Sequence, residues 1–155
     1  MHNLVKHIVK NIGIILFLLI SVLITTQAYS EQTAEDIIKN RKALFSKNYN
    51  TAKKVQSLSS SGDFKSAKKL MLEMSENYKT LKEMFPDNTK EGFNTEVLPL
   101  VWEEKDKFNS LMEKASNDMV ELASVIESAD NIRGTLGKLM WGNCKACHSK
   151  YREEH

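Results

Sequence analysis

Two cysteines and a histidine lie within five residues near the C-terminus, in the order Cys144-Lys145-Ala146-Cys147-His148. On a helix, positions i, i+3 and i+4 share one face, so both thiols can add to the vinyl groups of a haem while the imidazole reaches the iron. The chain has only these 2 cysteines, and a disulfide between them would cross-link nothing distant. The motif therefore predicts one haem c, attached through both cysteines, with His148 as its axial ligand.

Other sites that use cysteine pairs lack their usual context here. A thioredoxin-like pair expects a βαβ unit, and the sequence has no strand signal. A zinc site needs four ligands, and beyond residue 30 the only other histidine is His155, which as a terminal residue is expected to fray. Arg152 follows His148 by four residues and is predicted to stack on the same helical face beside the haem. A solvated arginine that suits the helix dipole is the alternative reading for Arg152.

The N-terminus reads as an export signal. Lys6 and Lys10 precede an apolar stretch over residues 12–24, and Ala28-Tyr29-Ser30 resembles a cleavage site. The stretch is shorter than the ~20 residues of a bilayer span, so we predict a cleaved signal peptide over 1–30 and a periplasmic haem domain over 31–155, with a retained anchor as the alternative. Without the two lysines of this segment, the chain has 20 basic and 20 acidic side chains and a formal net charge of zero. No basic patch remains to favour a nucleic-acid partner.

Apolar residues recur at helical spacing in four segments of the predicted haem domain. The first helix is expected from about Thr33 to Leu58 and the second from Phe64 to a stop near Pro86. A loop over 86–94, rich in Pro, Asp, Asn and Gly, separates them from a third helix over 102–126, and a fourth begins near Ile132 and carries the cysteine motif. With no strand signal, the pattern predicts an all-α fold, an antiparallel four-helix bundle of up-down-up-down topology with a C-terminal haem-attachment helix.

The chain resembles the class II cytochromes c, especially cytochrome c′, over essentially the whole of residues 31–155. The likeness lies in three segments. One is residues 34–42, one is a middle segment, and one is Leu136-Gly137 together with the attachment motif and the residues up to Tyr151-Arg152. That middle segment comprises Phe85, Pro86, Gly92, Thr95, Glu96, Pro99, Trp102 and Phe108. The segment Trp141-Gly142-Asn143 is bulkier than is usual before the first cysteine of this family, which leaves local packing open.

The resemblance implies several haem contacts beyond the motif. Arg41 and Lys42 would lie at the haem edge, with Arg41 placed for a propionate, and Thr95 and Glu96 would line the same cavity. Trp102 would be the family's core tryptophan. For Lys42 an ordinary surface position is equally open, whereas Arg41 interrupts an apolar stripe and needs an anionic partner if it is buried.

The residue four positions after Arg41 decides the coordination of the iron in this family. Methionine there gives low-spin electron carriers, and a residue that cannot coordinate leaves one face open, as in cytochrome c′. The residue is Phe45, so the resemblance implies a five-coordinate haem with His148 as its only protein ligand. A distant methionine, with Met71 and Met74 the nearest in principle, is the alternative, although both look like core residues.

A five-coordinate haem under an aromatic residue favours NO and CO, because these ligands need little hydrogen bonding from the protein. We therefore expect a non-enzymatic protein that binds NO or CO and cycles by one electron with a redox partner protein. The alternative is a methionine-ligated class II cytochrome that only carries electrons. A helical bundle that serves only in protein interaction would require the motif to be accidental. A homodimer is possible by the resemblance, and no membrane association is expected once the signal is removed.

Overall fold

The structure, a computed structural model, describes residues 32–154; the predicted signal peptide and His155 lie outside these residues. The first described helix, α2 (Ala34–Ser61), begins where the Thr33 hydroxyl accepts a hydrogen bond from the Asp36 amide at 3.1 Å. It ends at Gly62, whose φ of 83° is a left-handed conformation that glycine adopts without a steric penalty. Local capping thus fixes both ends of this helix close to the predicted bounds.

The long connection lies between the second and third predicted helices. Helix α3 (Phe64–Lys82) begins at the capping carboxylate of Asp63, which accepts from the Ser66 amide. The segment predicted as a loop holds one 3-10 turn, η1 (Asp87–Thr89). The predicted third helix is divided into α4 (Leu100–Glu103) and α5 (Lys105–Val125), because Glu104 leaves the helical region with φ −116° and ψ 42°.

The predicted fourth helix contains an irregular turn that the sequence pattern did not reveal. After a short 3-10 turn η2 (Ile126–Ser128), the chain forms α6 (Ile132–Leu136), a π-helical turn η3 (Gly137–Trp141), and α7 (Gly142–Tyr151). The Gly142 amide donates to the carbonyl of Gly137, five residues back. A Cβ at position 142 would lie 3.2 Å from that same oxygen, so glycine lets the wide turn close.

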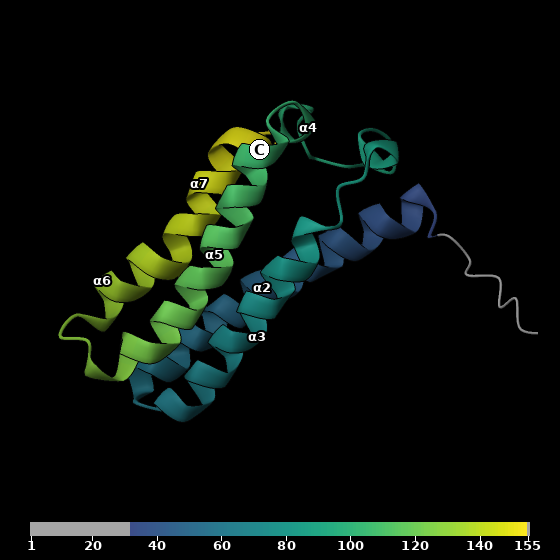
Figure 1. Ribbon diagram of the computed structural model, residues 1–155. Helices are drawn as coiled ribbons and strands as arrows, with labels where there is room; N and C mark the ends of the chain where they lie inside the picture. The colour runs from purple at the N-terminus through teal and green to yellow at the C-terminus, as the bar shows by residue number, and fades with distance from the viewer. Residues whose placement is uncertain (1–31, 155) are drawn as a thin grey trace, which may run out of the picture. The chain divides into compact units, whose positions relative to one another are not determined.

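The helices pack in the predicted antiparallel four-helix bundle (Figure 1). Helix α3 packs against both α2 and α5, α5 packs against α7, and α6 contacts α2, so the helices form a closed ring. Its fully buried apolar residues include Ile38, Val55, Met71, Met74, Leu81, Met119, Leu122, Ile126 and Met140. Within the described residues the only β pairing is one isolated antiparallel bridge between Val97 and Arg152. No helix in this part of the chain is both long and apolar enough to span a bilayer.

Candidate functional site

A cavity of about 640 Å³ lies inside the bundle, next to the cysteine motif. Most of its wall is apolar and comes from α2, α5 and the segment after α3. The apolar and aromatic lining residues are Phe45, Tyr49, Tyr78, Phe85, Val97, Val101, Phe108, Leu111, Met112, Ala115, Trp141 and Tyr151. Every one of the nine site residues predicted from the sequence also lines this cavity. The fold therefore gathers residues that lie more than a hundred positions apart in the chain.

The attachment motif lies in α7 with its three reactive side chains on the cavity wall. Both cysteines are free thiols. Burial raises the pKa of Cys144, and burial with the neighbouring Cys144 raises the pKa of Cys147 to about 11, so both remain protonated at neutral pH. Burial and the charge of Arg152 lower the pKa of His148, which favours the neutral imidazole that can donate a lone pair to a metal.

Asn143 holds the start of α7 against α5. Its amide nitrogen donates to the buried carboxylate of Asp118 at 2.9 Å and to the carbonyl of Leu139 at 2.8 Å. On the other side of the motif, the Trp141 indole donates to the Gln56 side chain at 2.8 Å, and its ring meets Tyr49 edge to face. The segment Trp141-Gly142-Asn143, left open by the sequence, thus anchors the motif to both α5 and α2.

Arg41 is buried in the cavity wall, with 1% of its surface exposed. Its guanidinium donates to Thr89 Oγ1 at 2.9 Å, to the Thr89 carbonyl at 3.1 Å and to Thr95 Oγ1 at 2.6 Å. It also lies 4.8 Å from the centroid of the Phe85 ring. All these partners are uncharged, and burial lowers the pKa of Arg41 to about 10. Arg41 is therefore a buried cation for which the described residues provide no carboxylate in contact.

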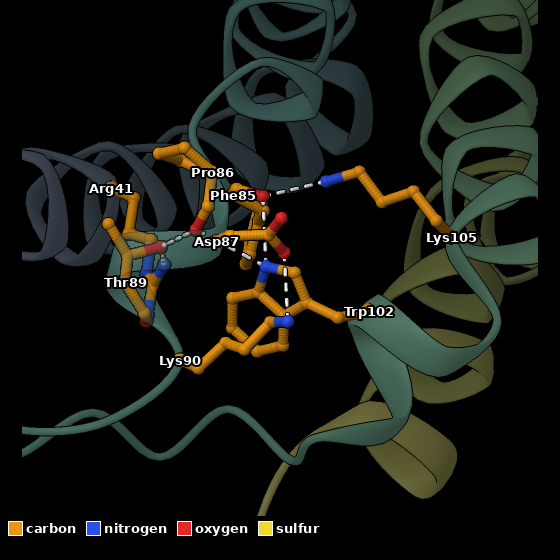
Figure 2. A network of polar contacts seen from close by, with 8 residues as sticks. All are labelled: Arg41, Phe85, Pro86, Asp87, Thr89, Lys90, Trp102 and Lys105. Atoms are coloured by element: carbon orange, nitrogen blue, oxygen red, sulfur yellow. Dashed lines mark hydrogen bonds and ion pairs between the residues drawn. The ribbon is translucent and has the colours of Figure 1, made fainter.

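The segment after α3 is fixed by hydrogen bonds to its backbone (Figure 2). The Trp102 indole donates to the Phe85 carbonyl at 3.0 Å, and the Lys105 ammonium donates to the same oxygen at 2.9 Å. Thr89 Oγ1 donates to the Pro86 carbonyl at 2.8 Å while it accepts from Arg41. Trp102 does not line the cavity; it packs edge to face on Phe85, which does. It therefore acts on the cavity through Phe85.

The other residues predicted at the haem edge lie together at the rim. The Lys42 ammonium donates to the Asn94 carbonyl at 2.8 Å, which ties α2 to the loop. Thr95 receives the Arg41 hydrogen bond described above. The carboxylate of Glu96 acts in the direction that raises the pKa of His148, against the lowering effect of burial.

Arg152 lies near His148, but not as the sequence predicted. Helix α7 ends at Tyr151, and Arg152 has the extended conformation, with φ −126° and ψ 146°. The Leu98 amide donates to the Tyr151 carbonyl at 3.0 Å, and the Glu153 amide donates to the Glu96 carbonyl at 2.9 Å. This pairing with the loop ends the helix one residue before the predicted stacking position. Arg152 still lines the cavity and lowers the pKa of His148.

Glu104 fastens the end of α7 to the start of α5. Its carboxylate accepts from the Tyr151 hydroxyl at 3.2 Å and pairs with Lys150 and Lys107. The hydrogen bonds from Lys150 and Lys107 lower the pKa of Glu104 from 4.5 to about 2. Since the folded-state pKa lies below the unfolded one, the stabilisation from Glu104 is fully present above its unfolded pKa and is lost as pH falls towards the folded value.

We therefore expect Glu104→Gln to lower the free energy of unfolding by a constant amount at neutral pH. This difference from the native chain should shrink below pH 4.5 and vanish near pH 2, the unfolded and folded pKa values of Glu104. Urea unfolding at a series of pH values measures it, with Glu103→Gln, at the exposed neighbouring position, as the matched control. A Glu104→Gln deficit that persists unchanged to the acid limit would show that the carboxylate acts by packing alone.

Several lining residues were not singled out as site residues from the sequence. Asn48 and Tyr78 fitted the helical stripes and so looked like core positions, and Met112 looked the same on the third helix. Met71 and Met74, the alternative ligands, are fully buried in the core and do not line the cavity. Periodicity identifies inward-facing residues, but it cannot separate a packed core from a cavity wall.

The donor set of the cavity fits a haem. Two thiols and an imidazole share one wall, as covalent attachment and axial ligation require. The remaining wall is chiefly aromatic and aliphatic, which suits a flat apolar macrocycle. Arg41, whose Nε has no hydrogen-bond partner, offers an unneutralised buried cation to a propionate.

The chain is similar to known proteins over most of its length. The family model for cytochrome c′ matches residues 36–152. The cytochrome c′ of Rhodopseudomonas palustris is 29% identical over 120 residues, covering 76% of this chain and 82% of that protein. The crystal structure of cytochrome c′ from Rubrivivax gelatinosus superposes with a TM-score of 0.67 at 26% identity, covering 79% of this chain and 98% of that one.

A more distant structure shares the fold. It is the nitric oxide complex of a cytochrome c′ variant from Alcaligenes xylosoxidans, with a TM-score of 0.68, 18% identity, and coverage of 81% of this chain and 100% of that one. The matched range, the bundle and the attachment motif agree with one another. This chain therefore belongs to the cytochrome c′ family of c-type haem proteins, with haem c attached through Cys144 and Cys147.

Proposed function

We propose that this cytochrome is a periplasmic, non-enzymatic protein whose haem iron takes His148 as its only protein ligand and binds NO or CO on the other face. The bound haem supplies a metal centre for small diatomic ligands and for one-electron exchange with a redox partner protein. The observation that carries this proposal is that Phe45 lines the cavity. By the resemblance to the class II cytochromes c, this is the position at which the methionine-ligated members carry their ligand residue. A phenyl ring has no lone pair to donate to a metal.

The packing of Phe45 supports a fixed steric role. Its ring lies edge to face on Phe85, with centroids 6.4 Å apart. Phe85 in turn packs on Phe108 at 4.7 Å and is held through its carbonyl by Trp102. An aromatic side chain in such an array has few alternative rotamers, so it restricts entry to the cavity without competing for the metal. The nitric oxide complex of the structurally similar Alcaligenes protein supports NO as a ligand class.

One observation favours the alternative of a methionine-ligated electron carrier. Met112 on α5 lines the cavity and is 3% exposed, and a thioether there could in principle reach a bound metal. Optical and paramagnetic spectra of the holoprotein separate the two functions. High-spin signals support the open face, whereas low-spin signals that disappear in Met112→Leu would identify Met112 as the second ligand.

Phe45→Ala tests the steric role directly. We expect the Phe45 ring to raise the activation free energy of CO association by ~1.4 kcal/mol, which corresponds to about a tenfold slower rate. Removing the ring should therefore speed CO association by about tenfold. Flash photolysis of the CO-bound ferrous protein measures the rate. Phe93→Ala is the matched control, because Phe93 is 52% exposed and does not line the cavity. An equal rate of CO association in the native and Phe45→Ala proteins would mean that Phe45 does not restrict access to the ligand site.

A further inference from the structure

The cavity wall contains a polar notch formed by Asn48 on α2 and Tyr78 on α3, both buried. Asn48 is 3% exposed, and its Oδ1 accepts a hydrogen bond from Asn77 Nδ2 at 2.7 Å. This contact determines which way the amide points, because the oxygen is held towards α3. The Asn48 nitrogen is the other branch of the same planar amide, and it has no hydrogen-bond partner among the described residues.

The notch has more donor hydrogens than acceptors. Asn48 Nδ2 carries two hydrogens and the Tyr78 hydroxyl carries one. The acceptors nearby are the phenol oxygen, which the Asn48 amide approaches closely enough to affect its pKa, and the sulfur of Cys144, which contacts the phenol. Sulfur is a weak acceptor, and it remains so as a thioether. At least one Asn48 N–H is thus left without an acceptor, which is costly for a buried group unless something in the cavity accepts it.

The position of Asn48 indicates where in the cavity such an acceptor would lie. Arg41, Phe45 and Asn48 follow at intervals of four and three residues, so they share one face of α2, and all three line the cavity. Asn48 therefore faces the same side of the cavity as Phe45, which is the side where the proposed function places a small ligand. A buried N–H on this side of the cavity would contact the outer atom of the ligand.

We propose that Asn48 is a specificity-determining residue, whose amide donates a hydrogen bond to the outer atom of a diatomic ligand held in the cavity. This inference rests on the proposed function. The sequence predicted a ligand site without hydrogen-bond donors, because Phe45 supplies none. Asn48 would add one donor to that site. The cavity then favours ligands whose outer atom accepts a hydrogen bond, such as NO, over CO, which accepts one poorly.

Infrared spectroscopy of the CO-bound holoprotein tests the proposal. A donor near the outer oxygen draws electron density into the antibonding orbital of CO and lowers its stretching frequency. Asn48→Leu, which keeps similar volume and removes both donors, should therefore move the band to higher frequency. It should also reduce the ratio of NO affinity to CO affinity by about fivefold, the effect of one neutral hydrogen bond. Asn48→Ala gives the same test if leucine does not fit the site.

Ser59→Ala is the matched control. Ser59 is also on α2, is 1% exposed and has an unpartnered hydroxyl, but it does not line the cavity, so its loss should leave the band unmoved. A band that stays in place in both Asn48 variants would overturn the proposal, even if CO association becomes faster, since that result shows a displaced water instead. Failure of the native holoprotein to bind CO at all would refute the proposed function itself.

Discussion

Replacing Arg41 by alanine should destabilise the holoprotein by about 3 kcal/mol, because the change leaves buried acceptors unpaired and opens a void. The guanidinium connects α2 to the Met84 and Thr89 carbonyls and to two threonine hydroxyls. These groups belong to the segment that forms one side of the cavity. Without the guanidinium, they would have to find water inside the protein or rearrange the segment.

The same substitution should lower the midpoint potential of the haem. Arg41 is a buried cation in the cavity wall, and removing a positive charge makes the addition of an electron less favourable. Thermal unfolding and redox titration measure the two effects. Lys42→Ala is the control, since Lys42 is exposed and makes one hydrogen bond, so its effect on stability should be within about 0.5 kcal/mol. An Arg41→Ala protein with native stability and native potential would mean that the guanidinium neither supports the segment nor neutralises a bound anion.

The bundle was predictable because its signals are local. Capping by Thr33, the glycine at position 62 and the stripes of apolar residues each act within a few residues of the chain, and the structure contains all three. The attachment motif was predictable for the same reason, because one helical turn contains all its chemistry. Resemblance added Arg41 and Phe45, and the structure places both in the cavity wall.

The features that could not be predicted depend on contacts between distant segments. The Val97 and Arg152 bridge, which ends α7, joins residues 55 positions apart in the chain. The π-helical turn at Gly137 depends on a glycine five residues later and on partners in α2 and α5. By its spacing, Asn48 is an ordinary inward-facing residue. Its missing hydrogen-bond partner and its place in the cavity wall follow only from the three-dimensional structure.

Replacing both Cys144 and Cys147 by alanine should abolish covalent haem and, with it, the cooperative fold of the domain. Without haem, the mainly apolar wall of this cavity of about 640 Å³ loses the group it would pack against and is left in contact with water. Because a typical domain is stable by only about 5–15 kcal/mol, the loss of these contacts should remove most of that margin. The walls should therefore collapse, and the helices should persist without fixed side-chain packing.

Mass spectrometry of the unfolded protein measures attachment, and near- and far-ultraviolet circular dichroism measures packing and helix content. The single variants Cys144→Ala and Cys147→Ala are the matched controls, because each keeps one thiol for a thioether and keeps His148. They should retain haem and a cooperative transition. A haem-free double variant that still unfolds cooperatively, with native near-ultraviolet signals, would show that the helices pack without the cofactor. The cavity would then be preformed by the contacts of Arg41, Asn143 and Trp102 rather than maintained by the group it holds.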